Sequence, residues 1–286
     1  MSDRAQREVE LKLELPPEAV SRVSRHRSLE RYGEGPVTTR RLRSIYFDTV
    51  DRALLHAGLS LRIREIGDGD PPQRVQTLKA DERARAGLFQ REEDEVEVHG
   101  TLPEPQAVSD PTLRGTLQRA LSGRTLRPIF ETDVQRSQRR MRLGRDVWSA
   151  DLDVGELRAG DLREPLCELE LELVRGSPVR LYDTALALLA DVPLTPGLVS
   201  KAQCGYALAE GRHLPPPLAE ALAGMREALD DVPAEKRATL EAELEWLEQE
   251  CAQARRRDDL ERLRRSPRFA RTALELGRIA ALAADR

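Results

Sequence analysis

Acidic residues recur at every second position in two segments that lie far apart in the chain. The first segment contains Glu8, Glu10, Lys12 and Glu14, and the second contains Glu168, Glu170 and Glu172. Because side chains on a β-strand alternate between its two faces, each segment would place its charges on one face and its aliphatic residues on the other. Carboxylates that repeat about 7 Å apart repel one another unless a cation neutralises them. Their oxygens are the ligands that Mg²⁺ and similar cations prefer, so the pattern predicts a divalent metal site.

Basic residues recur in a similar way on other segments of the chain. They are Arg41, Arg43, Arg62, Arg64, Lys79, Arg91, Arg136 and Lys201. The guanidinium fork of Arg matches the oxygens of a phosphate group. If the charged faces point inward, the acidic side can hold cations and the basic side an anion. This arrangement predicts a chain of phosphates bound together with Mg²⁺ or Mn²⁺.

The alternative is that the charged faces form the solvated exterior of a sandwich. For any single strand this is the more ordinary arrangement, since one face of an antiparallel sheet commonly contacts water. Such faces usually mix Ser, Thr and Gln with the charges, whereas these two segments concentrate carboxylates. Taken as a set, the segments therefore favour an inward charged face.

The elements that must carry these residues are mostly strands. Alternation of apolar and polar residues predicts strands over residues 8–15, 40–49, 58–66, 73–79, 90–98, 130–136, 139–143, 147–153 and 166–174. Helices are predicted over residues 16–25, 103–125 and 179–190. Many short strands with few helices indicate an α+β fold in which an antiparallel sheet closes into a barrel or tunnel.

Composition excludes several classes of partner. The 286 residues contain 46 Lys and Arg against 50 Asp and Glu, and this balance argues against binding to nucleic acid or to an anionic membrane. The cysteines form no metal-binding or disulfide pattern and are expected to be small buried side chains. No apolar run approaches the roughly 18 residues of a membrane span, and the N-terminus has no apolar signal region. We therefore expect a cytoplasmic protein.

Seven motifs, in this order, resemble the CYTH domain of the triphosphate tunnel metalloenzymes over about residues 6 to 210. They are Glu8-x-Glu10-x-Lys12, Tyr46–Thr49, Leu61–Arg64, Thr77–Lys79, Asp151–Glu156, Cys167–Leu173 and Ser200–Ala202. Three further segments resemble the bacterial inorganic triphosphatase branch, which has a CYTH–CHAD layout: Gly87–Arg91, Arg127–Asp133 and Gly205–Leu208. The resemblance implies an eight-stranded antiparallel tunnel that binds triphosphate and divalent metal.

The resemblance also implies roles for individual residues. The implied metal ligands are Glu8, Glu10 and members of the set Glu168, Glu170 and Glu172, of which we favour Glu168 and Glu170. The implied phosphate-binding cations are Lys12, Arg62, Arg64, Lys79, Arg91, Arg136 and Lys201. The implied catalytic set is Glu8, Glu10, Lys12 and Asp153. The expected reaction is metal-dependent hydrolysis of tripolyphosphate to pyrophosphate and phosphate, without a covalent intermediate.

The C-terminal part of the chain changes to a helical period. Residues 1–210 are assigned to the tunnel domain, residues 211–217 to a Pro-rich linker and residues 218–286 to a helical segment of two or three helices. The segment resembles part of a CHAD domain but is too short for a whole one, so we interpret it as a truncated remnant. It is expected to pack against the tunnel or against a second subunit in a homodimer.

Two other functions remain open at this point. The same tunnel could act on an organic triphosphate, as in a thiamine triphosphatase or a class IV adenylate cyclase. Alternatively, it could bind polyphosphate without turnover. Aromatic residues make up only 3% of the chain, which leaves little to stack on an organic ring and favours the inorganic substrate.

Overall fold

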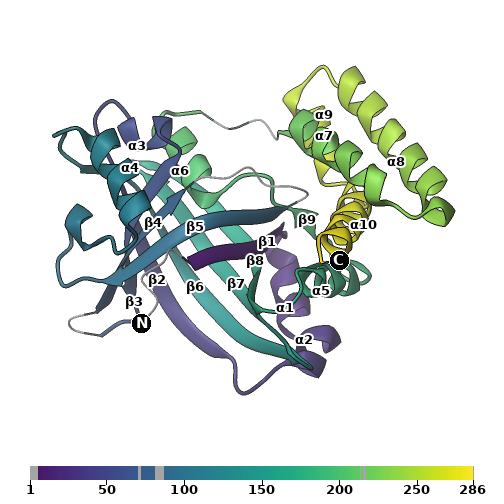
Figure 1. The fold of residues 1–286 in the computed structure, drawn as a ribbon, viewed down its shortest axis with the longest axis horizontal. Helices are drawn as coiled ribbons and strands as arrows, with labels where there is room; N and C mark the ends of the chain where they lie inside the picture. The colour runs from purple at the N-terminus through teal and green to yellow at the C-terminus, as the bar shows by residue number, and fades with distance from the viewer. Residues whose placement is uncertain (1–5, 70–71, 81–86, 213, 215–216, 286) are drawn as a thin grey trace.

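The computed structural model describes residues 6–69, 72–80, 87–212, 214 and 217–285. Among these residues, eight strands form a closed antiparallel barrel in the order β5-β4-β3-β2-β6-β7-β8-β1, and pairing of β1 with β5 closes it (Figure 1). A two-residue strand, β9 (Thr195–Pro196), pairs with β1 outside the barrel. The barrel strands are β1 (Gln6–Glu14), β2 (Thr38–Asp48), β3 (Leu59–Ile66), β4 (Gln73–Ala80), β5 (Leu88–Glu97), β6 (Arg127–Leu143), β7 (Asp146–Ala159) and β8 (Leu162–Arg175). The predicted fold class is confirmed.

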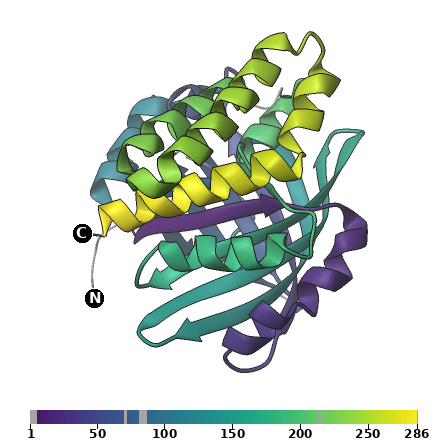
Figure 2. The same ribbon diagram turned by 90° about the vertical axis from the view of Figure 1, so that its right-hand side faces the viewer.

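The alternation of β1 separates a charged interior from an apolar exterior. Glu10 and Lys12 lie on the inner face, while Leu11 and Leu13 are completely buried on the outer face. That outer face packs against α5 (Val179–Leu189) and α10 (Pro267–Ala284), which run alongside β1 (Figure 2). The leucines of β1 therefore anchor the strand from outside and leave its charged side chains facing the barrel.

Short helices cover the ends and sides of the barrel. They are α1 (Val20–Ser24), α2 (Arg27–Tyr32), α3 (Ala53–His56), α4 (Pro111–Leu121) and α6 (Lys201–Ala209), with 3₁₀ turns at Pro17–Ala19 and Pro105–Ala107. Helix α6 begins at a capping box formed by Ser200 and Gln203. It packs so closely on β6 that a Cβ atom at Gly205 would overlap the ring of Phe130. This close packing fixes Lys201, the first residue of α6, at the barrel interior.

The C-terminal helical segment, residues 218–285, contains more helices than predicted. It consists of α7 (Leu218–Ala228), a 3₁₀ turn at Leu229–Asp231, α8 (Ala234–Gln253), α9 (Arg257–Arg264) and α10. These four α-helices share a second apolar core that includes Leu244, Leu247, Phe269 and Leu276. Leu274 of α10 instead joins the core outside β1. Helix α10 therefore connects the segment to the barrel.

Two other predicted boundaries are wrong. The strands predicted at 130–136 and 139–143 are one strand, β6, because the residues between them include no Gly or Pro that would turn the chain. The helix predicted over 103–125 is confined to α4, whose N-terminus is set by the Asp110 cap and Pro111. The predicted linker falls partly on residues 213, 215 and 216, which lie outside the described residues. Among the helices that are described, none combines the length and the apolar character of a membrane span.

Candidate functional site

The barrel encloses a cavity of about 200 Å³ with charged walls. Seven cationic side chains line it: Lys12, Arg62, Arg64, Lys79, Arg91, Arg136 and Lys201. Seven acidic side chains also line it: Glu8, Glu10, Glu93, Glu95, Asp151, Glu170 and Glu172. The prediction that the charged faces point inward is thus confirmed for all seven implied phosphate-binding residues. Two other predicted site residues, Asp153 and Glu168, lie directly behind the cavity wall and contact Lys201.

Two arginines that were predicted to belong to the inward basic face point outward. Arg41 forms a two-pronged ion pair with Asp133, at 2.9 and 2.8 Å. Arg43 likewise binds Glu131, from Nη2 to Oε2 at 2.6 Å. On β2 the inner face is instead occupied by Ser44 and Tyr46, at the alternate positions. The exterior of the barrel is therefore charged too, and alternation alone did not identify the inner face.

Strand register brings two carboxylates together without a close cation. Glu10 of β1 lies directly opposite Glu172 of β8. Burial and the neighbouring Glu170 and Glu8 raise the pKa of Glu10 to about 8. Its nearest ion-pair contact is Arg91, at 3.9 Å. Burial, followed by Glu8 and Glu93, raises the pKa of Glu172 to about 7, and no ion pair to it is found in the described part of the chain. This pair is a place where a cation would relieve repulsion.

Glu8 contrasts with its neighbour Glu10. It accepts hydrogen bonds from Lys79 Nζ at 2.8 Å and from Arg91 Nε at 2.5 Å. Although burial opposes ionisation, these two cations lower the pKa of Glu8 to about 2. Glu8 is therefore held as a carboxylate at any physiological pH.

One cation of the cavity lacks a carboxylate partner among the described residues. Arg64 donates from Nε to Ser44 Oγ at 3.1 Å and makes no ion pair with any residue that the structure describes. Burial, together with Arg62 and Arg136, lowers the pKa of Arg64 to about 10. A guanidinium in this position is stabilised by an added anion. Among the described residues, Glu10 therefore has no cation closer than Arg91 at 3.9 Å, and Arg64 has no carboxylate partner.

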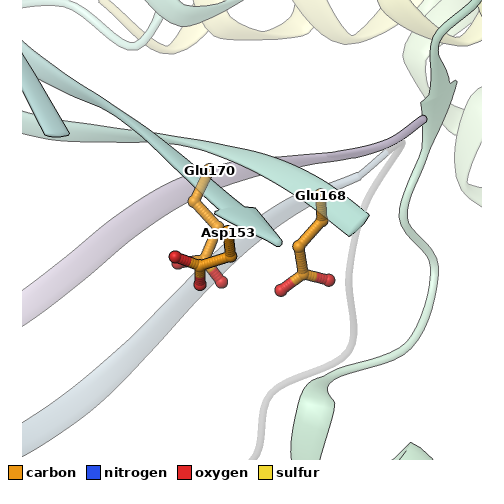
Figure 3. Close-up of side chains that lie close together, drawn as sticks. All are labelled: Asp153, Glu168 and Glu170. Atoms are coloured by element: carbon orange, nitrogen blue, oxygen red, sulfur yellow. The ribbon is translucent and has the colours of Figure 1, made fainter. Parts of the chain in front are cut away.

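A second carboxylate cluster lies at the rear of the cavity. Asp153, Glu168 and Glu170 place one oxygen each within 4.8 Å of one another, a spacing that suits a metal ion (Figure 3). The ammonium of Lys201 already contacts all three, at 3.0 Å in the case of Asp153. Arg136 adds a two-pronged pair to Asp153, with both bonds at 2.7 Å. The charge of this rear cluster is therefore balanced by the protein itself.

Three acidic residues of the cavity were not predicted from the sequence. Glu93 binds Lys79 at 3.0 Å, and Glu95 accepts a hydrogen bond from Thr77. Asp151 binds Arg136 at 2.9 Å. All three could have been found by alternation, since Glu93 and Glu95 continue the face of Arg91 and Asp151 shares the face of Asp153.

The raised pKa values predict how stability depends on pH. A carboxyl whose pKa rises on folding keeps its proton in the folded state after the unfolded chain has lost it, so its contribution to stability falls as pH rises. For Glu10 this window runs from about 4.5 to about 8. In EDTA, the melting temperature of the wild type should therefore fall relative to that of Glu10→Gln between pH 5 and pH 8. If the melting temperatures of the two proteins change in parallel across this range, Glu10 does not have a raised pKa.

The chain is similar in sequence and in fold to known proteins. The profile of the CYTH domain family matches residues 6–203. An inorganic triphosphatase from Haemophilus influenzae is 29% identical over 174 residues, which are 60% of this chain and 47% of that protein, so the chain spans about half the length of this relative. A solved structure from Hippeastrum, described as a candidate adenylyl cyclase with dominant triphosphatase activity, is 23% identical. It covers 73% of this chain and 99% of its own, and its TM-score of 0.51 shows a similar fold. Since the family match extends over more than two thirds of its residues, the chain belongs to the CYTH domain family.

Proposed function

We propose that this protein is a divalent-metal-dependent hydrolase that cleaves inorganic triphosphate to pyrophosphate and phosphate inside the barrel. One observation carries the proposal. Among the described residues, one cavity holds Glu172 without an ion-pair partner, Glu10 with only a long contact of 3.9 Å to Arg91, and Arg64 without a carboxylate partner. A triphosphate with its metal ions supplies both charges at once. A metal ion alone would leave Arg64 without an anion, and a triphosphate alone would add negative charge near Glu10 and Glu172.

The size of the cavity supports an inorganic substrate. Its volume of about 200 Å³ is below the roughly 300–1,000 Å³ of sites that enclose drug-sized organic molecules. Two aromatic residues, Tyr46 and Phe89, line it. Tyr46 is already stacked on Phe130. An organic group on the substrate would therefore have to remain outside the cavity. The similarity to an inorganic triphosphatase points to the same substrate.

We propose Glu10 and Glu172 as the central metal ligands. This assignment differs from the expected pair of Glu168 and Glu170, because Lys12 at 2.7 Å and Lys201 hold the carboxylate of Glu168, and Arg136 and Lys201 hold that of Glu170. Carboxylate oxygens suit Mg²⁺ or Mn²⁺. Bound there, such a cation would neutralise phosphate charge and make a water molecule more acidic, which is the chemistry that phosphoanhydride hydrolysis requires.

The remaining residues bind and orient the phosphates. Arg64 is the first anchor, because its guanidinium has no competing carboxylate among the described residues. Arg62, Lys79, Arg91 and Arg136 surround it and would stabilise the charge that spreads over the phosphate oxygens during transfer. These four are held in place by ion pairs before substrate arrives, so little ordering is needed on binding.

Phosphate release from three substrates tests the proposal. The purified chain should release phosphate fastest from tripolyphosphate, more slowly or not at all from ATP and thiamine triphosphate, and not in EDTA. Calorimetric titration of each substrate should accompany the assay. Binding of tripolyphosphate without release in Mg²⁺ or Mn²⁺ would identify a binding module instead, and faster release from an organic triphosphate would overturn the assignment of the substrate.

A further inference from the structure

Glu14 continues the charged row of β1 but faces a different space. Glu8, Glu10 and Lys12 line the tunnel cavity, whereas Glu14 lines a second cavity of about 790 Å³. This rear cavity lies between the barrel and the C-terminal helical segment, which Figure 1 shows beside β9. Lys12 and Lys201 line both cavities, so their side chains form part of the wall that separates them.

A cation from the C-terminal helical segment neutralises Glu14. Arg264, at the end of α9, donates from Nη1 to Glu14 Oε2 at 2.8 Å, across 250 positions of sequence. Arg264 is only 6% exposed, and its other nitrogens bind Glu261 at 3.2 and 3.0 Å. In the described part of the chain, it is the one cation that forms an ion pair with Glu14.

Strand register places Glu14 beside the carboxylate that Lys12 binds. Glu14 of β1 lies directly opposite Glu168 of β8. The ammonium of Lys12 binds Glu168 Oε2 at 2.7 Å and the carbonyl oxygen of Val199 at 3.1 Å. Two carboxylates directly opposite each other repel and compete for the same nearby cations. Without Arg264, the ammonium of Lys12 would be drawn between Glu14 and Glu168, on the rear side of the wall.

We propose that Arg264 is a positioning residue for the tunnel. By binding Glu14, it leaves Lys12 with a single carboxylate partner, and Lys12 can then exchange part of that contact for a phosphate oxygen. The C-terminal helical segment thus supports anion binding in the tunnel cavity, although none of its described residues lines that cavity. The inference rests on the proposed function to the extent that the tunnel must bind phosphates.

The packing around Lys12 explains why its ammonium would respond to the charge of Glu14 in the rear cavity. A Cβ atom at Gly197 would lie 2.6 Å from Cγ and 2.8 Å from Cδ of Lys12. The alkyl chain of Lys12 is therefore pressed against the backbone of the loop that leads to α6. A change in the balance of nearby carboxylates would therefore act on the ammonium, which Glu168 and the carbonyl of Val199 hold in this structure.

A double-mutant cycle in the full chain tests the proposal. Arg264→Gln should raise KM for tripolyphosphate about tenfold, with kcat little changed, and should weaken tripolyphosphate binding measured by calorimetry in EDTA by a similar factor. Glu14→Gln alone should resemble the wild type, and Glu14→Gln with Arg264→Gln should return KM close to the wild-type value. Arg264→Lys, which keeps the charge, should also retain a KM near that of the wild type.

Arg265→Gln is the matched control. Arg265 is adjacent in sequence, 70% exposed, and contacts only Glu261, at 3.6 Å, among its described ion pairs. Its removal should leave KM unchanged. Glu14→Gln could instead raise KM as much as Arg264→Gln, with no recovery in the double variant. The ion pair would then only hold the C-terminal helical segment against the barrel, and the proposal would be overturned.

The proposed function and this inference can fail independently. Absence of phosphate release by the wild type would refute the proposed function alone. Equal tripolyphosphate affinities of the wild type and Arg264→Gln, measured by calorimetry, would refute the inference about Arg264.

Discussion

Glu10→Gln should abolish turnover and at the same time stabilise the metal-free protein. The substitution removes one oxygen ligand of the proposed metal site, and the loss of a single charge-stabilising group in an active site typically costs about 10²–10³-fold in kcat. It also removes a buried carboxylate that repels Glu8 and Glu170. Relief of such repulsion is expected to add about 1–2 kcal/mol to the free energy of unfolding. Phosphate release and melting in EDTA measure the two effects.

The combination of lost activity and gained stability is more informative than either result alone. A substitution that merely damages the fold lowers both. Glu131→Gln is the matched control, since Glu131 lies on the outside of the barrel, where it binds Arg43 and Arg158. That variant should retain full activity and gain no stability. Unchanged phosphate release by Glu10→Gln would remove β1 from the active site.

Alternation of residue types predicted the barrel, and it identified the inner face where the opposite face is aliphatic. On β1, Glu10 and Lys12 alternate with Leu11 and Leu13, and only one assignment of the two faces buries the leucines under helices. The same reasoning failed for Arg41 and Arg43. On β2 both faces carry polar residues, and the partners of those arginines, Asp133 and Glu131, lie some 90 positions away on β6.

The assignment of individual carboxylates depended on register, which local sequence does not specify. Glu168, Glu170 and Glu172 are equivalent by alternation. Pairing of β8 with β1 places Glu172 opposite Glu10, Glu170 opposite Lys12 and Glu168 opposite Glu14. Glu172 and Glu168 therefore each lie opposite a carboxylate, whereas Glu170 lies opposite an ammonium. The contact of Glu14 with Arg264 depends further on how a separate set of helices packs on the barrel, and it leaves no local signal in the sequence.

Lys201→Met should produce the largest loss of stability among the cavity residues. Its ammonium is shared by Asp153, Glu168 and Glu170, and its removal leaves three clustered carboxylates with less compensation. Breaking a buried ion pair from one side commonly costs about 3–5 kcal/mol. Because oxygens of the three carboxylates lie within 4.8 Å of one another, Mg²⁺ or Mn²⁺ should bind in place of the ammonium and raise the melting temperature of the variant much more than that of the wild type.

Lys236→Met provides the control, because Lys236 is exposed on α8 and its loss should change neither stability nor the response to metal. If divalent cations do not change the melting temperature of Lys201→Met, then the three carboxylates of the rear cluster do not need a cation between them for stability. If metal restores the fold but not phosphate release, then the ammonium does more than balance three carboxylates. That outcome would assign Lys201 to phosphate binding, since a divalent ion held by the three carboxylates supplies the same positive charge.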